Sequence, residues 1–246
     1  MAYQYRKGPE ADTPRRPRVG TGVIVGAFVL FGFTLLYLYF TLEENRWLFW
    51  VTLLASIVLT AITINFFRIP RRQYLGPLFD GKEVIAAADG RIVVIEEVME
   101  EEFLQEKCLM VSTFMSVLNV HANWIPMKGK VLAVHHHQGN YHKAYLPKAS
   151  IENEHTTVLL EVAGGRRIVM RQVAGALAQR IITWVKAGET VSLGTLMGFI
   201  LFGSRVDLFL PLGSDVRVRL DEPVRANRTL MAVLPENEPT VKKDGV

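Results

Sequence analysis

The chain has only one cysteine, Cys108, among its 246 residues. A single thiol excludes an intramolecular disulfide framework and a zinc or iron–sulfur site built from cysteines. The segment around it, LQEKCLMV, is typical of a β-strand. We therefore interpret Cys108 as a packed strand residue rather than as a catalytic nucleophile.

A strong excess of one charge is also absent. The chain carries 28 Lys and Arg against 24 Asp and Glu, a net charge of +4. So mild a balance does not indicate nucleic-acid binding. Hydrophobic residues make up 50% of the chain and charged residues 21%, which excludes a disordered protein. The mean hydropathy of +0.20 is high for a soluble domain and indicates membrane segments.

Two segments, 19–42 and 47–67, contain no charged residue. Each is long enough to cross a hydrocarbon core of ~30 Å as a helix, which takes ~20 residues. Only the four residues EENR separate them, and Tyr and Trp residues near this link suit an interfacial aromatic belt. We predict a transmembrane helical hairpin over 19–67, with a basic N-terminus at 1–18. The alternative is a buried helical pair in a soluble core.

Basic residues flank the hairpin on both sides, whereas the link has one Arg against two Glu. The flanking residues are Arg6, Lys7, Arg15, Arg16 and Arg18 before the first span, and Arg68, Arg71 and Arg72 after the second. By the positive-inside rule both ends face the cytoplasm. The remainder of the chain is therefore expected on the cytoplasmic face of the cytoplasmic (inner) membrane.

Residues 68–233 alternate short apolar runs with turn signals such as Asp89-Gly90 and Lys128-Gly129. This spacing predicts a compact, mostly antiparallel β domain, making the whole chain mostly β with two helices (α+β). The predicted strands are 91–98, 108–113, 129–135, 156–162, 166–173, 189–193, 197–202 and 215–220. The segment 171–185 fits helix and strand templates equally well, and we favour two strands meeting at Gly175. The polar residues 234–246 are expected to form a flexible tail.

Two segments of this domain share a pattern of apolar strand, glycine turn and apolar strand. They are IPMKGKVLAVHHHQG at 125–139 and WVKAGETVSLGTLMGFI at 184–200. Biotinyl and lipoyl carrier domains are flattened barrels, or barrel-sandwiches, built from two such halves. One alternative function is thus a membrane-tethered adaptor barrel without catalysis. However, neither candidate for the carrier lysine of such domains has the expected neighbours. Lys128 is followed by Gly129 instead of a second Met, and Lys143 lacks the preceding Asp of a lipoyl site, so we interpret both as solvated surface lysines.

Four histidines, His135, His136, His137 and His142, lie within eight residues of one another. Successive side chains of a strand point to opposite faces, so three consecutive histidines cannot all converge on one ion. No acidic residue follows nearby until Glu152. We therefore expect no metal site here. The histidines are expected to lie on a strand that is either at the surface or lines a wet cleft. His121 lies in an apolar run where a buried imidazole needs a partner, and spacing alone favours a core histidine.

Six ordered blocks of sequence resemble phosphatidylserine decarboxylase proenzymes, especially the short bacterial form with an N-terminal membrane hairpin. The resemblance covers about residues 66–233. The blocks are FFRIPRR at 66–72, AAADGRIVVIEEV at 86–98, FMSVLNVHANWIPMKGKV at 114–131, KASIENEHT at 148–156, RQVAGALAQRI at 171–181 and FGSRVDLFLP at 202–211.

The resemblance implies a chain that cuts itself between Gly203 and Ser204. The products would be a β chain of residues 1–203 and an α chain of residues 204–246, the latter beginning with a pyruvoyl group made from Ser204. That group would be the cofactor, in place of pyridoxal phosphate or a metal. Its carbonyl would form a Schiff base with the amine of phosphatidylserine, and phosphatidylethanolamine would be released. The implied partners are the phospholipid membrane and phosphatidylserine, with no nucleic acid.

The chemistry explains the Gly-Ser pair. A glycine permits the tight turn that brings the Ser204 hydroxyl onto the Gly203 carbonyl. Attack would convert the amide into an ester, and β-elimination would then break the chain. Because a serine hydroxyl is a weak nucleophile at neutral pH, it needs a base.

The resemblance assigns that role to His121, with Asp89 fixing the tautomer of its imidazole. Asp89 has a structural alternative, since Asp-Gly is a common turn pair. Longer family members have a second histidine where this chain has Leu118, which leaves the proton donor after CO₂ loss open between His121, another polar group and water. Gly198, Phe199 and residues 135–145 are expected to line the cleft.

The sequence does not decide the acyl-chain preference, the exact serine phospholipid or homo-oligomer formation. A second alternative function is that of a degenerate family member that only binds lipid.

Overall fold

The computed structural model describes residues 21–41, 46–139, 153–175, 180–201 and 204–236. The chain divides into two compact units, residues 1–67 and residues 68–246.

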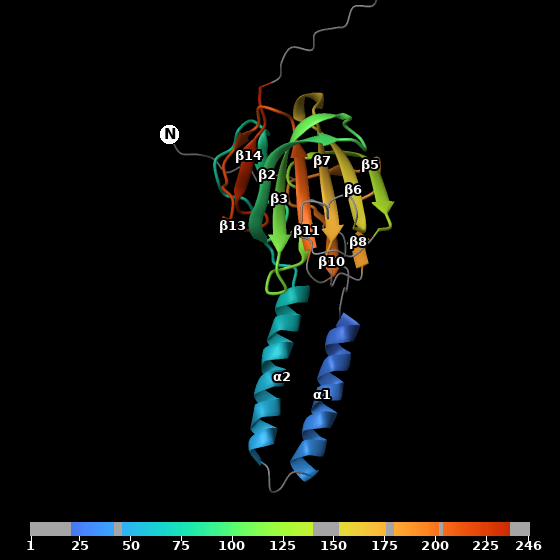
Figure 1. The fold of residues 1–246 in the computed structure, drawn as a ribbon, viewed down its shortest axis with the longest axis vertical. Helices are drawn as coiled ribbons and strands as arrows, with labels where there is room; N and C mark the ends of the chain where they lie inside the picture. The colour runs from blue at the N-terminus through green and yellow to red at the C-terminus, as the bar shows by residue number, and fades with distance from the viewer. Residues whose placement is uncertain (1–20, 42–45, 140–152, 176–179, 202–203, 237–246) are drawn as a thin grey trace, which may run out of the picture. The chain divides into compact units, whose positions relative to one another are not determined.

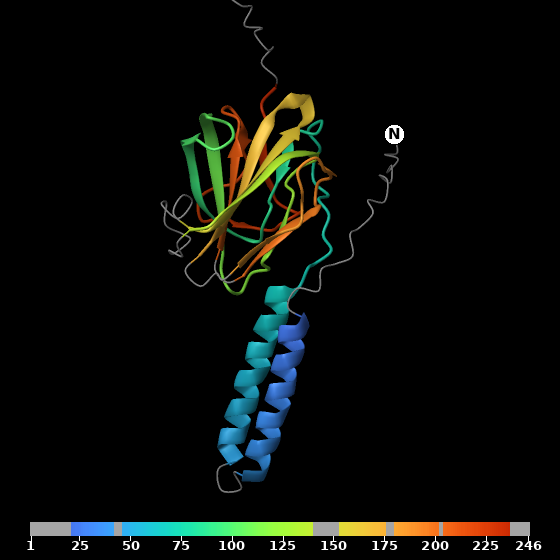
Figure 2. The same cartoon turned by 90° about the vertical axis from the view of Figure 1, so that its right-hand side faces the viewer.

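The first unit contains two long helices, α1 (Thr21–Thr41) and α2 (Arg46–Phe67), which lie side by side and run in opposite directions (Figures 1 and 2). Their apolar side chains point outward, as at Leu30, which is 71% exposed, and Leu59, which is 66% exposed. Four threonine hydroxyls donate to the carbonyl four residues earlier, at Thr34, Thr41, Thr52 and Thr63. Because these polar groups are satisfied within the helix, they are compatible with hydrocarbon. Both helices are long and apolar enough to span a membrane, which indicates membrane association.

The second unit is built on one curled antiparallel sheet of eight strands, in the order β13-β2-β3-β11-β7-β6-β5-β9 (Figures 1 and 2). These strands are β2 (Gly90–Glu100), β3 (Glu106–Met115), β5 (Gly129–His137), β6 (His155–Val162), β7 (Arg167–Ala174), β9 (Thr190–Val191), β11 (Ser204–Leu210) and β13 (Pro223–Val224). A single 3₁₀ turn at Ala163–Gly165 joins β6 to β7.

Two smaller antiparallel sheets complete the unit. The first has the order β4-β10-β8 and the second the order β1-β14-β12. Their strands are β4 (Ala122–Trp124), β8 (Arg180–Thr183), β10 (Leu196–Leu201), β1 (Glu83–Ile85), β12 (Asp215–Val216) and β14 (Leu230–Val233). The fold is thus mostly β with two helices, which confirms the predicted class.

The long sheet has two differently filled faces. Val206 and Leu208 of β11 point to what we call the inner face, where they join the main hydrophobic core. Phe209, one position further along, points to the outer face and packs with Cys108 and Met110 of β3. Alternation along a strand explains this division. The two faces therefore carry separate cores.

The strand predictions hold best where runs are long. The ambiguous segment 171–185 contains two strands, β7 and β8, as favoured, and residues 176–179 between them lie outside the described part. The predicted strand 215–220 is wrong in length, because only Asp215–Val216 pairs, and Leu220 beyond it is 58% exposed. The predicted strand 189–193 is likewise only Thr190–Val191, since Gly194 follows in a turn with φ of 78°. Leu234, in the predicted tail, still donates to the carbonyl of Lys82 at 2.9 Å.

Two glycines of the predicted turn pairs are the first residues of strands. The predicted strand 129–135 already begins at Gly129, whereas the predicted strand 91–98 begins one residue after Gly90. Gly90 is the first residue of β2, and a Cβ there would lie 2.1 Å from the Phe114 carbonyl oxygen. Gly129 is the first residue of β5, and a Cβ there would lie 2.5 Å from the Glu161 carbonyl oxygen. Both positions need glycine because a neighbouring backbone approaches closely, not because of turn geometry.

The two similar segments at 125–139 and 184–200 pair with each other. Gly129 lies opposite Val191 and Lys130 opposite Thr190 in an antiparallel ladder. The Ile125 amide also donates to the Thr195 carbonyl, and the Gly194 amide to the Ile125 carbonyl. The two segments that share the glycine-turn pattern are thus neighbours in the fold.

The contact at Gly129 gives a stability prediction. We expect Gly129→Ala to lower the free energy of unfolding by about 2–3 kcal/mol, because the added methyl must displace the β6 backbone. Gly165→Asn is the matched control: its site is open, its φ is 71°, and asparagine tolerates that conformation, so the cost should be about 1 kcal/mol or less. Denaturant unfolding of both variants tests this, and equal losses would contradict the close-contact explanation.

Candidate functional site

Ser204 is the first residue of β11 and lies between two neighbouring strands. It pairs with Met115 of β3 on one side and Ala174 of β7 on the other. Its side chain is fully buried, and among the residues that the structure describes its Oγ has no hydrogen-bond partner. A buried hydroxyl without a partner is energetically costly and is typical of a group kept for chemistry. Gly203, the other half of the expected cleavage bond, lies outside the described residues.

Beside Ser204 runs a chain of buried amide side chains that the sequence analysis did not identify. Thr183 donates to Gln172 at 2.9 Å, Gln172 donates to Asn123 at 2.7 Å, and the Asn123 amide lies 3.5 Å from the sulfur of Met115. Met115 is the cross-strand neighbour of Ser204. The signal available in the sequence was a polar residue inside each of two apolar blocks, at Asn123 and Gln172.

His121 is fully buried just before β4. Its Nδ1 lies 3.0 Å from the carbonyl oxygen of Asn119. A carbonyl only accepts hydrogen bonds, so Nδ1 carries the hydrogen, and Nε2 of the neutral ring carries the lone pair. Burial lowers the pKa of His121 to about 4, although the bond to Asn119 acts in the opposite direction. The imidazole is therefore neutral at physiological pH and has the protonation state of a base.

Asp89 is buried immediately before β2, and its carboxylate is engaged on both oxygens. Arg72 donates to both of them, with the Nη2–Oδ2 distance at 2.9 Å, and the Ala226 amide donates at 2.9 Å. The hydrogen bond that fixes the His121 tautomer goes to the carbonyl of Asn119. The described partner of the His121 Nδ1 is thus a backbone carbonyl. The catalytic assignment of Asp89 stays a prediction.

Backbone hydrogen bonds bring the three segments together. The Trp124 amide donates to the Ala87 carbonyl at 2.9 Å, which joins the strand after His121 to the segment before Asp89. The Ile200 amide donates to the His121 carbonyl at 3.2 Å, four residues before Ser204. The segments that carry His121 and Asp89 thus bond to each other, and the His121 segment also bonds to β10, which ends three residues before Ser204.

Three further residues singled out in the sequence lie in different surroundings. Leu118 is 64% exposed in the turn between β3 and β4, so a hydrocarbon side chain occupies the position where longer family members have histidine. Phe199, expected to line the cleft, is fully buried, and its ring centre lies 6.5 Å from that of His121. Cys108 is buried in β3, and burial together with the charges of Glu100 and Glu106 raises its pKa to about 11, so it is an unreactive thiol.

The residue after Ser204 begins a buried charged pair on the outer face. Arg205 and Asp207 are both fully buried, and the Nε–Oδ1 distance is 2.8 Å. The two residues are two positions apart on β11, so their side chains share a face. Burying such charges requires pairing, because removal of one partner leaves an uncompensated charge. The pair thus fixes the conformation of β11 directly after Ser204.

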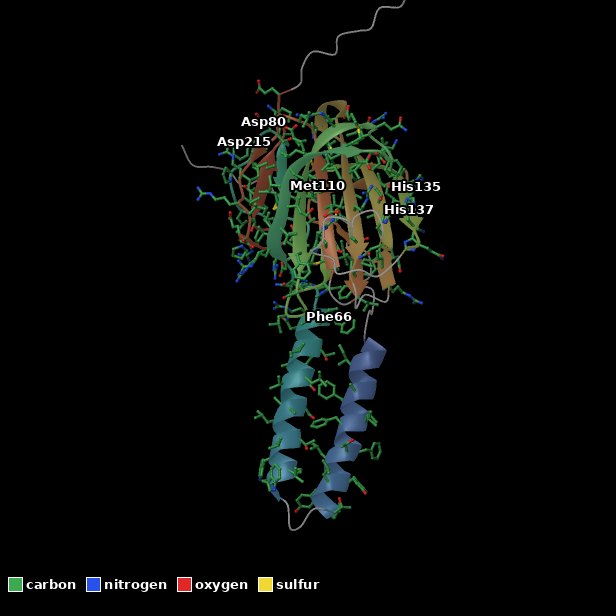
Figure 3. All side chains as sticks on the ribbon, viewed as in Figure 1. Phe66, Asp80, Met110, His135, His137 and Asp215 are labelled. Carbon is green, nitrogen blue, oxygen red and sulfur yellow. The ribbon has the colours of Figure 1, made fainter. Side chains whose placement is uncertain are left out.

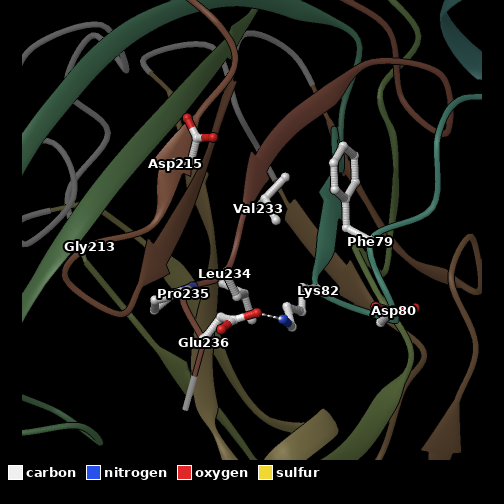
Figure 4. Close-up of a pocket in the computed structure, with 9 residues that line it drawn as sticks. All are labelled: Phe79, Asp80, Lys82, Gly213, Asp215, Val233, Leu234, Pro235 and Glu236. Carbon is white, nitrogen blue, oxygen red and sulfur yellow. Dashed lines mark hydrogen bonds and ion pairs between the residues drawn. The ribbon is translucent and has the colours of Figure 1, made fainter. Parts of the chain in front are cut away.

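A surface pocket of about 380 Å³ lies elsewhere in the domain (Figure 4). Strand β14 and the segments beside β1 and β12 line it, and Lys82 and Glu236 form an ion pair of 3.0 Å at its rim. None of the residues Ser204, His121 and Asp89 lines this pocket. We therefore place the candidate site at the start of β11 and not in the pocket.

The comparisons with known proteins agree with the sequence blocks. A family model described as phosphatidylserine decarboxylase matches residues 59–232. A phosphatidylserine decarboxylase proenzyme of Porphyromonas gingivalis is 48% identical over 217 residues, covering 88% of this chain and 97% of that protein. Proteins of the same name are 45% identical in Parabacteroides distasonis, covering 87% of this chain and 96% of that protein, and 40% identical in Paraburkholderia phytofirmans, covering 76% and 84%. The family model covers the end of the second helix and nearly all of the β domain, and the relatives cover most of the chain. On these grounds the chain belongs to the phosphatidylserine decarboxylase family.

Proposed function

We propose that this chain is a membrane-anchored proenzyme that cleaves itself at Gly203–Ser204 and then decarboxylates phosphatidylserine to phosphatidylethanolamine. Family membership supports the decarboxylase activity. The single structural observation behind the self-processing is the fully buried Ser204, whose Oγ has no hydrogen-bond partner among the described residues. The non-catalytic adaptor and the lipid-binding relative remain as outcomes of the tests below.

Self-processing would begin at the Ser204 hydroxyl. Its oxygen attacks the carbonyl carbon of Gly203, the amide C–N bond breaks, and an ester links the two residues. Removal of the Ser204 Cα proton then expels the Gly203 carboxylate by β-elimination and leaves dehydroalanine. Tautomerisation, addition of water and loss of ammonia convert this residue into an N-terminal pyruvoyl group. No external oxidant or reductant is needed, because the elimination supplies the higher oxidation state of Cα.

His121 is the proposed base for both proton transfers. Its Nε2 lone pair is oriented by the bond from Nδ1 to the Asn119 carbonyl. A low pKa keeps the ring neutral, and burial excludes water that would compete for the hydroxyl proton. The bond from Ile200 to the His121 carbonyl places the histidine segment alongside the strand that leads to Ser204.

Asp89 is proposed to act on the shape of the site. By accepting hydrogen bonds from Arg72 and Ala226, it holds residues 86–90 in the position where the Ala87 carbonyl receives the Trp124 amide. That contact orients β4, and β4 directly follows His121. In this proposal Asp89 positions the base through the backbone.

The surroundings of Ser204 fit a pyruvoyl group made in place. The hydroxyl occupies a buried position without a protein partner, and the Asn123 amide approaches Met115 beside it. When formed, the pyruvoyl group supplies an electrophilic carbonyl that accepts the electron pair left by the departing carboxylate. Asn123 and Gln172 would orient groups at the start of β11. His121 or water would return the proton, since Leu118 has no exchangeable hydrogen.

The hydrophobic hairpin is proposed to hold the β domain at the cytoplasmic face of the inner membrane. The excess of basic residues on both flanks of the hairpin supports this orientation. A two-chain lipid then needs to lift only its headgroup from the bilayer to reach a buried site. Anchoring therefore raises the local concentration of substrate rather than contributing to the chemistry.

The first prediction of the proposed function concerns Ser204. Purified protein should consist of two chains, the smaller of about 5 kDa by its share of the 27.7 kDa total. Intact-mass measurement should find the small chain about 17 Da lighter than the same peptide with an N-terminal serine, the ammonia lost on forming a pyruvoyl group. Ser204→Ala should remain a single chain without activity. A full-length wild-type protein that decarboxylates phosphatidylserine would contradict the mechanism, and an intact inactive one would favour the adaptor.

The second prediction concerns the pH dependence of cleavage. Because the pKa of His121 is lowered to about 4, it should stay a competent base as the pH falls. Precursor made by cell-free translation into lipid nanodiscs should therefore be cut at an unchanged rate between about pH 8 and about pH 5. A histidine with an ordinary pKa would instead lose half of its base form at about pH 6.5. His121→Gln should leave the precursor uncut. A rate that declines with a midpoint near the ordinary value would remove His121 from this role.

The third prediction separates anchoring from chemistry. A chain of residues 68–246 keeps Arg72 and every proposed processing residue, so it should still cut itself. Its activity on phosphatidylserine in bilayers should fall by at least about tenfold more than its activity on lipid dispersed in detergent, because only the former depends on surface attachment. Equal losses on both substrates would contradict the proposed role of the hairpin.

A further inference from the structure

Two histidines and one carboxylate converge on the outer face of the long sheet. We call Glu102, His137 and His155 the histidine–glutamate cluster; one possible ligand atom from each lies within 4.8 Å of the others. The His137 Nε2 lies 2.7 Å from Glu102 Oε1, and the rings of His137 and His155 are stacked with centres 4.6 Å apart. Figure 3 labels His137 and, close to it on β5, His135, whose Nδ1 lies 3.2 Å from the same glutamate oxygen.

Strand register explains which histidines meet. His137 lies directly opposite His155 in the ladder of β5 and β6, so their side chains share one face. His136 points to the other face, where its Nδ1 lies 2.9 Å from the Thr156 hydroxyl. The run of three histidines is thus divided, as alternation requires. The missing acidic ligand comes from Glu102, in the turn between β2 and β3.

The turn that presents Glu102 is held in a defined conformation. Glu100 is 1% exposed and accepts the backbone amides of Phe103 and Leu104, each at 2.8 Å. Arg171 then binds Glu100 at 3.0 Å and Glu102 Oε2 at 3.2 Å, and its Nε donates to Thr157 at 3.0 Å. The second oxygen of Glu102 is therefore fixed, while its first faces the histidines.

The same contacts resemble those that support metal ligands in proteins. A ligating histidine usually donates its other ring N–H to a carbonyl, and a ligating carboxylate is itself hydrogen-bonded. His155 Nδ1 lies 2.7 Å from the Asn153 carbonyl oxygen, so the Nε2 atom of His155 carries the lone pair that can bind a metal. Glu102 has Arg171 in the corresponding place. Two carboxylates, Glu100 and Glu102, face the single guanidinium of Arg171, and these three side chains together carry a net charge of −1 that a cation would offset.

From these contacts we propose that the histidine–glutamate cluster binds one divalent transition-metal ion, with zinc as the best match. Two imidazoles and one carboxylate form a donor set that zinc binds with a fourth ligand, whereas magnesium and calcium prefer oxygen alone. His135 or water would supply that fourth ligand. The ion would join the β2–β3 turn to β5 and β6, strands that the sheet order otherwise keeps apart.

The site is structural and separate from the proposed chemistry. Cross-strand pairing places His155 opposite Val173, and Val173 opposite Arg205, so the cluster shares the face of Arg205. Ser204 precedes Arg205 on the strand and points to the inner face with Val206. Metal binding should therefore change stability, and its test does not depend on the decarboxylase mechanism.

The experiment uses the full, untagged protein in detergent after removal of metals with a chelator. Added Zn²⁺ should bind at one ion per chain and, at about 100-fold excess over its dissociation constant, raise the Tm by about 5 °C. Co²⁺ should give the visible absorption of a tetrahedral site, and Zn²⁺ should displace it. Absence of both the Tm rise and the Co²⁺ spectrum would overturn the proposal.

Matched variants locate the ion. His137→Gln should weaken Zn²⁺ binding by at least about tenfold, and Glu102→Gln should do the same. His136→Gln is the control, because it removes a neighbouring histidine of the other face and should leave the affinity unchanged. If His136→Gln weakens binding as much as His137→Gln, the ion is held by the exposed histidine run and the proposed site is wrong. His137 is 42% exposed, so its replacement should not prevent folding.

Discussion

The backbone pairing of β11 on both of its edges is the constraint on which the rest of the domain depends. All seven of its residues are buried, and its ladders run to β3 on one side and β7 on the other. Ser204 is the first residue of this strand, so the register that builds the sheet also fixes the proposed nucleophile. A shift of one residue would turn Ser204 to the outer face and Arg205 into the apolar core.

The same pairing bears on the proposed cleavage. Residues 204–236 contribute β11 to the long sheet between β3 and β7, β13 to its edge beside β2, and β14 to the sheet with β1. A chain that begins at Ser204 would therefore stay bound through antiparallel ladders with strands of the preceding residues. Each hydrogen bond contributes only about 0.5–1.5 kcal/mol, but the buried side chains of β11 add a continuous apolar contact. Cutting the backbone before β11 would leave this network intact.

Burial divides the polar groups of the domain into two kinds of environment. Around β4, His121 has a backbone carbonyl as its partner and a lowered pKa, and the amides of Asn123 and Gln172 bind each other. On the outer face, the charges of Arg205 and Asp207 compensate one another. An uncharged polar set suits proton transfer at neutral pH, because burial favours the neutral form of the base. The ion pairs instead stabilise the shape of the sheet around it.

The sequence alone determined the helical hairpin, most long strands and the family. Uncharged runs, apolar runs and ordered blocks are local signals, and each is readable without knowing what the segment will contact. Tertiary structure decided the partners. Arg72, which charge patterning assigned to a membrane flank, binds Asp89, and the His121 tautomer is fixed by Asn119. Glu102 meets His137 from 35 residues away, because the register of β5 and β6 and the turn after β2 converge there. Such contacts follow from long-range strand pairing, which no pattern within a single segment encodes.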